Sequence, residues 1–153
     1  MGMATTRTII LPSETDTAAL AQRIAPMLIA GDVLLLEGDI GAGKTAFSRA
    51  LIRARLGYDE DVPSPTFTLV QTYEDEVDIW HCDLYRLTHP DEAVELGLEE
   101  AFEEAICLIE WPDRLADLAP KTALTLQFKA GEQHSVTFAA DDNWTARLEA
   151  AGV

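Results

Sequence analysis

The pattern of apolar and polar positions predicts a chain in which strands and helices alternate. Residues 33–36 (VLLL) form an unbroken apolar run, which is typical of a short strand buried on both faces. Residues 46–56 place apolar side chains at helical spacing, and residues 106–109 (ICLI) form a second run suited to a buried strand. The inner face of the 46–56 helix is expected to carry Phe47, Leu51 and either Ile52 or Ala54.

The segment ahead of the first buried run predicts one strand and one helix. Residues 7–11 form a short strand candidate, which Pro12 ends. Residues 13–16 (SETD) have the pattern of a capping box, so a helix is expected to begin here and to run to about residue 28. Its apolar face is expected to carry Leu20, Ile24, Met27 and Leu28.

Two hairpins are predicted further along the chain. Residues 67–73 and 77–84 are rich in β-branched and aromatic side chains, and the short acidic turn between them favours an antiparallel pair. Residues 122–128 and 134–139 alternate around Gly131 and predict a second antiparallel pair.

Short helices are predicted in the remaining segments. Residues 90–96 begin a helix that Gly97 interrupts and that can resume to about residue 102. Residues 112–118 suit one or two helical turns, and residues 143–150 suit a closing helix.

A glycine-rich stretch, residues 38–45 (GDIGAGKT), separates the first buried run from the helix that follows. Its spacing fits the P-loop, in which backbone N–H groups and a helix N-terminus surround a phosphate chain. Lys44 is expected to reach the β- and γ-phosphates, and the Thr45 hydroxyl is expected to ligate Mg²⁺. The residues expected to hold the phosphates are Gly38, Asp39, Ile40, Gly41, Ala42, Gly43, Lys44, Thr45 and Ala46.

A P-loop among these elements predicts an α/β fold of the P-loop NTPase-like class. The expected architecture is a three-layer sandwich whose mixed sheet is parallel near the nucleotide and antiparallel elsewhere. The chain of 153 residues suits one domain, which is expected to span residues 4–150.

Phosphoryl transfer also needs an acidic residue at the end of a neighbouring strand, and the sequence offers two. Glu110 closes the apolar run 106–109, and Asp83 closes the preceding predicted strand. The residues alone leave open which of the two faces the metal. Thr66, ahead of a predicted strand, is a candidate switch threonine near the γ-phosphate, and Trp111 is either a core aromatic or a wall beside the nucleotide.

The acidic composition limits the possible partners. The formal net charge is −16, and Lys44 is the only lysine before Lys121. Because nucleic-acid binding is driven largely by Lys and Arg on phosphates, this surface is expected to repel DNA and RNA. A nucleotide must then be captured by the local loop and Mg²⁺, and any role with RNA should run through a more basic partner.

The cysteines and the chain's start give further expectations. Cys82 and Cys107 lie in apolar strand-like segments and are expected to be buried free thiols. No segment has the pattern of a signal peptide or a membrane span, so a cytoplasmic protein is expected. Met1 and Gly2 are expected to be an addition ahead of a native start at Met3 rather than a myristoylation signal.

Four motifs occur here in the order in which they occur in the TsaE family, formerly YjeE, which the chain resembles. They are GDIGAGKT at 38–45, SPTFTL at 64–69, DLYRL at 83–87 and IEWP at 109–112. The resemblance implies a bacterial ATPase required for the threonylcarbamoyladenosine (t6A) of tRNAs that read codons starting with A. It further implies action with TsaB and the transferase TsaD, with TsaC supplying threonylcarbamoyl-adenylate. Direct binding of this chain to the tRNA is not expected.

The resemblance also implies roles for particular residues. Lys44 and Thr45 would hold phosphate and Mg²⁺, and Glu110 would be a metal ligand. Asp83 would be a metal-side or water-positioning acid, and Thr66 would belong to a switch-like loop.

The adenine side of the site is less completely matched. Trp111 is expected beside the nucleotide, and Ile10 and Glu14 resemble the family's adenine-side wall. The family places a basic residue near the C-terminal hairpin turn, whereas this chain has Glu132 there and Lys129 as the nearest lysine. That contact is therefore not carried over.

Two other functions remain open at this stage. A small-molecule kinase would need arginines closing over the phosphates; Arg49, Arg53 and Arg55 lie on the predicted P-loop helix, which leaves Arg86 and Arg114. A nucleotide-gated binding module with negligible turnover is the other alternative. A GTPase is disfavoured because the chain has no Asn-Lys-x-Asp motif.

Overall fold

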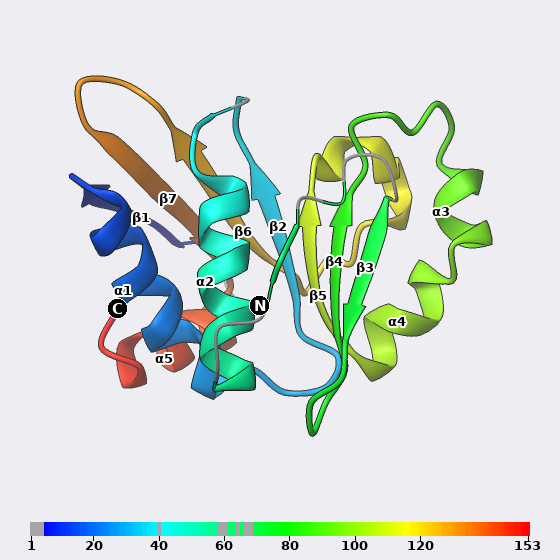
Figure 1. Cartoon of the computed structure of the whole chain (residues 1–153), viewed down its shortest axis with the longest axis horizontal. Helices are drawn as coiled ribbons and strands as arrows, with labels where there is room; N and C mark the ends of the chain where they lie inside the picture. Colours follow the sequence, from blue (N-terminus) through cyan, green and yellow to red (C-terminus); the bar gives the residue numbers. More distant parts are fainter. Residues whose placement is uncertain (1–4, 40, 58–60, 64, 66–68) are drawn as a thin grey trace.

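A computed structural model describes residues 5–39, 41–57, 61–63, 65 and 69–153. Its elements form one seven-stranded sheet with helices on both faces (Figure 1). The strands are β1 (Thr5–Leu11), β2 (Val33–Glu37), β3 (Val70–Tyr73), β4 (Ile79–Asp83), β5 (Ile106–Glu110), β6 (Leu124–Lys129) and β7 (His134–Ala140). The helices are α1 (Glu14–Ile24), α2 (Lys44–Leu56), α3 (Asp91–Glu95), α4 (Leu98–Glu104) and α5 (Asp142–Ala150), with 3₁₀ turns η1 (Ala25–Met27) and η2 (Pro112–Leu118).

The sheet is mixed, with strand order β1-β7-β6-β2-β5-β4-β3. Strand β2 pairs in parallel with β5 and β6, and β4 pairs in parallel with β5. The outer strands are antiparallel to their neighbours: β3 to β4, β7 to β6, and β1 to β7. The predicted combination of a parallel centre and antiparallel hairpins is confirmed, and the carboxyl ends of β2, β4 and β5 meet at one edge.

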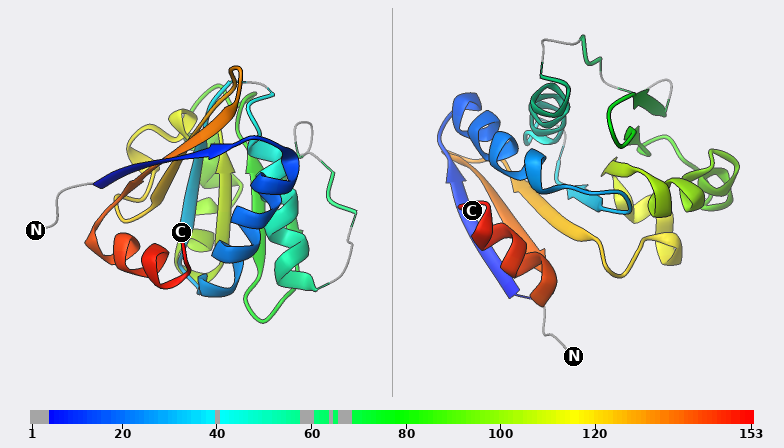
Figure 2. Two further views of the ribbon diagram at one scale, coloured as in Figure 1. Left: turned by 90° about the vertical axis from the view of Figure 1, so that its left-hand side faces the viewer. Right: turned by 90° about the horizontal axis from the view of Figure 1, so that it is seen from below.

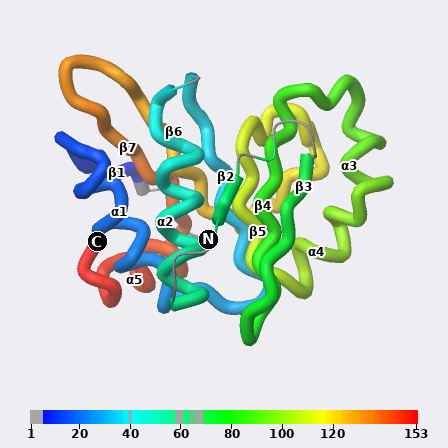
Figure 3. The backbone as a smooth tube through the Cα atoms, in the orientation of Figure 1, coloured from blue at the N-terminus to red at the C-terminus, as the bar shows by residue number. Residues whose placement is uncertain are grey.

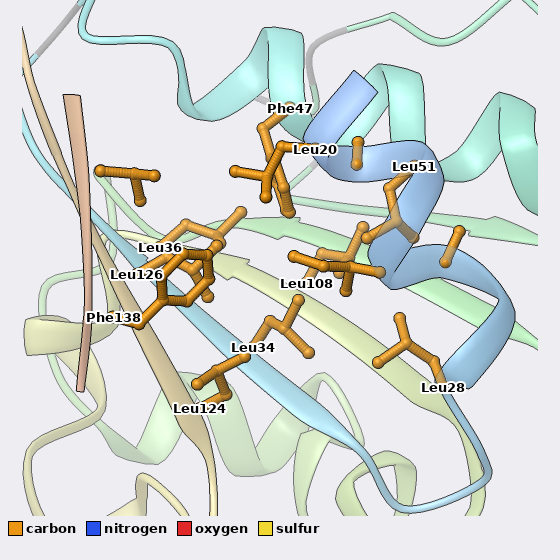
Figure 4. Packing of buried hydrophobic residues seen from close by; sticks show 14 of the residues in the cluster. Leu20, Leu28, Leu34, Leu36, Phe47, Leu51, Leu108, Leu124, Leu126 and Phe138 are labelled. Atoms are coloured by element: carbon orange, nitrogen blue, oxygen red, sulfur yellow. The ribbon is translucent and has the colours of Figure 1, made fainter. Parts of the chain in front are cut away.

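Two hydrophobic clusters, one on each face, make the three layers. Leu34 and Leu36 of β2 belong to the cluster under α1 and α2, whereas Val33 and Leu35 belong to the cluster under α3 and α4. Figure 4 shows the first cluster, with Phe47 and Leu51 of α2 pointing at the sheet. The ribbon views and the backbone tube show α1 and α2 lying side by side over this face (Figures 2 and 3). All four residues from Val33 to Leu36 are buried, as the sequence predicts for a strand covered on both faces.

Helix α1 begins with the predicted capping box. The Ser13 hydroxyl accepts from the backbone N–H of Asp16, and the Asp16 carboxylate accepts from the backbone N–H of Ser13. The prediction that this helix reaches residue 28 is wrong, because the α-helix ends at Ile24 and continues only as η1, with Pro26 inside it. Proline lacks the N–H that an α-helical bond requires, so the last turn tightens and Leu28 is extended.

Helix α2 begins two residues earlier than predicted and ends where predicted. Gly57 adopts a left-handed conformation, with φ 78°, and its N–H donates to the Arg53 carbonyl, which stops the helix. The sequence left open whether Ile52 or Ala54 lies on the inner face of α2. Ile52 is buried and Ala54 is exposed, so Ile52 is the inner residue.

Both predicted hairpins form, with shifted ends. Strand β3 begins at Val70, because Leu69 has a left-handed φ of 67°; residues 67 and 68 of the prediction lie outside the described residues. Strand β4 covers Ile79–Asp83, which is shorter than the predicted 77–84. Gly97 breaks α3 from α4 with φ 84°, as predicted.

Helix α5 is tied back to the turn before β2. Arg147 Nη2 lies 2.6 Å from Asp32 Oδ2, and it also donates to the Met27 carbonyl. Trp144 Nε1 donates to the Thr122 carbonyl. No helix in the part of the chain that the structure describes has the length and apolar character needed to cross a membrane.

Candidate functional site

The glycine loop leaves β2 at a place where only glycine fits. Gly38 has φ 141°, and a Cβ added to it would lie 2.5 Å from the carbonyl oxygen of Phe128 in β6. Gly41 and Gly43 also have positive φ, at 82° and 111°. The glycines therefore allow the backbone to curl between β2 and α2, which is the conformation that an anion-binding loop requires. Ile40 lies outside the described residues.

The loop ends at the N-terminus of α2, a helix of 13 residues. Its N-cap is Gly43, which has no side chain to satisfy the N–H groups of the first turn. Backbone N–H groups and the positive end of the helix dipole thus face the cleft, an arrangement that suits a phosphate.

Lys44 occupies the first position of α2. Its ammonium donates to the Gly38 carbonyl and lies 3.6 Å from the ring centroid of Trp111. Burial lowers the pKa of Lys44, an effect that Glu110 and Asp83 oppose by attraction. This lysine contacts the glycine loop directly, and it interacts with carboxylates on two neighbouring strands.

The two acidic candidates from the sequence lie side by side. Asp83 and Glu110 are direct partners in the parallel β4–β5 register, and both are buried. The Thr45 hydroxyl donates to Glu110, at 3.1 Å from Oε1. Asp83 Oδ1 accepts from the backbone N–H of Tyr85 at 3.0 Å. Glu110 is therefore the carboxylate bonded to the P-loop helix, with Asp83 beside it.

His81 is a site residue that sequence reasoning missed. It is fully buried, and its Nε2 atom lies 2.6 Å from Glu110 Oε2. The available signal was the alternation of a strand, because residues two apart share a face. His81 and Asp83 had to lie on one face of β4, but which carboxylate of another strand they would meet depended on strand order.

Trp111 follows Glu110 in a conformation that is unusual for an aromatic residue. Its φ and ψ are 59° and 54°, in the left-handed region. This turn packs the ring against Tyr85, with centroids 4.9 Å apart, and beneath the Lys44 ammonium. Trp111 also packs against the second hydrophobic cluster, so it is both a core aromatic and a wall of the cleft.

These groups open into a cleft of about 770 Å³. Among the described residues, its lining comprises Leu11, Pro12, Ser13, Glu14, Thr17, Gly41, Gly43, Lys44, Thr45, Ala46, Asp83, Tyr85, Arg86, Glu110, Trp111, Gly131, Glu132 and His134. The predicted phosphate and metal residues are thus brought together with Glu14 and with the turn between β6 and β7. Sequence reasoning did not identify Gly131 of this turn, or His134 at the start of β7, as lining residues.

Four predicted residues lie apart from this lining. Ile10 is half exposed, although its neighbour Leu11 lines the cleft. Asp39 is exposed, and Ala42 is buried in the first hydrophobic cluster. Gly38 packs against β6. Thr66 lies outside the described residues, so its place in a switch-like loop stays a prediction.

The oxygen donors at this site suit Mg²⁺. No group of three or more His, Cys, Asp or Glu side chains forms a metal cage among the residues described here. Mg²⁺ bound with a nucleotide typically takes only one or two protein oxygens and fills its other positions with phosphate and water. The Thr45 hydroxyl and the Glu110 carboxylate, 3.1 Å apart, are such a pair.

A buried strand, a glycine loop ending in Lys-Thr, a helix and an acid on the adjacent strand define a P-loop NTPase-like protein. Comparison with known proteins gives the family. The family model for the threonylcarbamoyl adenosine biosynthesis protein TsaE matches residues 11–138, and the chain belongs to the TsaE family.

Relatives from several bacteria support this assignment. The chain is 43% identical over 121 residues to the tRNA threonylcarbamoyladenosine biosynthesis protein TsaE of Rickettsia bellii, covering 78% of this chain and 84% of the relative. It is 40% identical over 132 residues to the protein of the same name from Bacillus subtilis, covering 84% and 82% of the two chains. The crystal structure of Bacillus subtilis YdiB superposes with a TM-score of 0.82 at 29% identity, over 99% of this chain and 97% of that one.

Proposed function

We propose that this protein binds and hydrolyses Mg-ATP in the cleft in support of tRNA threonylcarbamoyladenosine formation. The observation that carries the proposal is the convergence of Lys44, Thr45 and Glu110 at the N-terminus of α2. A glycine loop that meets a buried lysine, a hydroxyl and a carboxylate is matched to a triphosphate with its metal. Family membership then connects that chemistry to the modification of tRNA.

Each group has a distinct role in this proposal. The backbone N–H groups of the loop and of the first turn of α2 donate to the phosphate oxygens. Lys44 neutralises the β- and γ-phosphates, and Thr45 and Glu110 hold the metal. Bound Mg²⁺ would supply charge neutralisation to the phosphate oxygens. Asp83, beside Glu110, orients the attacking water and can accept its proton.

The protein's charge favours action through other proteins. A chain with net charge −16 repels the phosphates of tRNA over the range of its field. We therefore propose that TsaB and TsaD are its partners and that it meets tRNA only through them. ATP turnover is expected to be slow in the isolated chain and faster in the presence of TsaB and TsaD.

Two measurements test the proposal. Titration calorimetry of the full chain with ATP, with and without Mg²⁺, should show binding that strengthens with Mg²⁺; no heat under either condition would overturn the assignment. Phosphate release should then be followed with and without a purified TsaB–TsaD complex. Transfer of phosphate to an added metabolite would indicate a kinase, and partner binding without turnover would indicate a nucleotide-gated module.

A further inference from the structure

His81 and Glu110 form a buried pair whose geometry goes beyond an ordinary core contact. His81 is fully buried in β4, and its Nε2 atom lies 2.6 Å from Glu110 Oε2. Its other ring nitrogen, Nδ1, is buried and has no hydrogen-bond partner among the described residues. The one polar contact made by the His81 ring in this part of the chain is therefore the contact with Glu110.

The Glu110 carboxylate is held between two neighbours. Oε2 contacts His81 at 2.6 Å, and the Thr45 hydroxyl donates to Oε1 at 3.1 Å and to Oε2 at 3.4 Å. A glutamate side chain can otherwise rotate about its last bonds, and a hydrogen-bond donor packed against one carboxylate oxygen removes that freedom. The imidazole thus holds the carboxylate in the orientation in which it accepts from the Thr45 hydroxyl, with Oε1 as the nearer oxygen.

A purely space-filling role does not explain a histidine at this position. Burying an imidazole with one nitrogen unpaired is costly, whereas an apolar side chain would fill the same space without that cost. The neighbouring strand positions on this face, Ile79 of β4 and Leu108 of β5, are apolar. A histidine at this position therefore favours a role in which the ring donates a hydrogen bond to Glu110.

We propose that His81 is a positioning residue that donates from Nε2 to Glu110 and so prepares that carboxylate for the nucleotide-bound metal. This inference rests on the proposed function, because it assigns a supporting residue to the same site. It also specifies the tautomer: the proton is on Nε2, and Nδ1 is the unprotonated nitrogen.

The first test measures how much Mg²⁺ improves ATP affinity, by calorimetry in Mg²⁺ and in EDTA. His81→Leu and His81→Asn should each reduce the Mg²⁺-dependent gain by roughly 10- to 100-fold while leaving the affinity in EDTA unchanged. His81→Gln, whose longer amide reaches toward the position of Nε2, should keep most of the gain. Cys82→Ala is the matched control, because Cys82 is buried at the next position of β4 but faces the opposite cluster.

The outcomes separate the inference from the proposed function. A wild-type chain that binds no ATP would overturn the proposed function and this inference with it. A wild-type chain with a clear Mg²⁺-dependent gain that His81→Leu and His81→Asn retain would overturn the inference alone. Loss of thermal stability with an unchanged gain would show that the residue is merely structural.

A second measurement needs no variant and therefore does not depend on whether the variants fold. Nitrogen-15 NMR of the imidazole in the wild-type protein distinguishes the two neutral tautomers by their chemical shifts. We expect the Nε2–H tautomer for His81. An Nδ1–H tautomer would leave no proton for Glu110 and would overturn the inference.

Discussion

The hydroxyl of Thr45 and the carboxylate of Glu110 meet in a hydrogen bond of 3.1 Å, although the two residues are 65 positions apart in the chain. One lies in the first turn of the P-loop helix, and the other ends strand β5 beside β2. The parallel pairing of β2 and β5 brings them together, because it aligns the carboxyl ends of both strands.

Replacement of Lys44 should separate binding from folding. We expect Lys44→Ala to weaken ATP affinity by about 10- to 100-fold, as for loss of hydrogen bonds to a charged group. The fold should persist, because the ammonium lies at the cleft and not within either hydrophobic cluster. Calorimetry and a thermal unfolding curve measure the two effects, with Lys129→Ala, an exposed lysine of β6, as the control. Collapse of the fold in Lys44→Ala would contradict the assignment.

Replacement of Glu110 should affect turnover more than nucleotide binding. We expect Glu110→Ala to retain ATP binding in EDTA but to lose at least ~2 kcal/mol of transition-state stabilisation, measured as phosphate release. The companion variant is Asp83→Ala, since Asp83 is its direct register partner. Unchanged turnover in Glu110→Ala together with loss in Asp83→Ala would move the metal role to Asp83.

Glycine at position 38 should be required for stability as well as for binding. We expect Gly38→Ala to lower the free energy of unfolding by about 2 kcal/mol or more, because the added methyl would meet the Phe128 carbonyl oxygen at 2.5 Å and φ is 141°. Gly41→Ala is the matched control: it has a φ of 82° but open space around the added carbon. Its cost should be limited to about 1–2 kcal/mol of backbone strain. Equal losses in chemical denaturation would argue against the steric explanation.

Trp111 should report nucleotide binding through its fluorescence. It lines the cleft, whereas Trp80 lies in β4 and packs against the second hydrophobic cluster. ATP should change the tryptophan emission of the wild-type chain, and Trp111→Phe should abolish that change. Trp80→Phe should preserve it. A change that persists in Trp111→Phe would place the nucleotide away from this wall.

The two cysteines should be unreactive in the folded chain. Burial raises the pKa of Cys107 to about 12 and that of Cys82 well above its ordinary value of 9.0. Alkylation at pH 8 should therefore be slow until denaturant is added, which mass spectrometry can follow. Fast labelling of the native protein would contradict the burial of these thiols.

The same shift gives a pH dependence of stability. Between about pH 9 and pH 12 the folded state keeps the Cys107 proton, whereas the unfolded state loses it, so stability falls as pH rises through this window. The lowered pKa of Lys44 has the opposite effect on stability: at pH values just below 10.5, the ordinary pKa of a lysine, stability rises with pH. Comparison of the wild type with Cys107→Ala isolates the thiol contribution. The fall in stability between pH 9 and 10.5 should be shallower in that variant.

Much of this protein was predictable because the requirements are local. A glycine loop, a capping box and alternating hairpins each depend on backbone needs within a few residues, so their places were readable at 38–45, at Ser13 and around Gly131. The shifted ends have local causes as well: Pro26 tightens the end of α1, and the positive φ of Leu69 delays β3. Glu110 and Asp83 were candidates because each closes an apolar strand, and the family motifs added roles for both.

The amino-acid sequence by itself determined the place of the glycine loop, the mixed α/β class and a strongly acidic composition. Only the tertiary structure decided that Glu110 bonds Thr45, that His81 lies behind Glu110, and that Trp111 turns under Lys44. These relationships depend on which strands become neighbours and in what register. That outcome follows from packing the whole chain on both faces of the sheet, and no short segment carries the information.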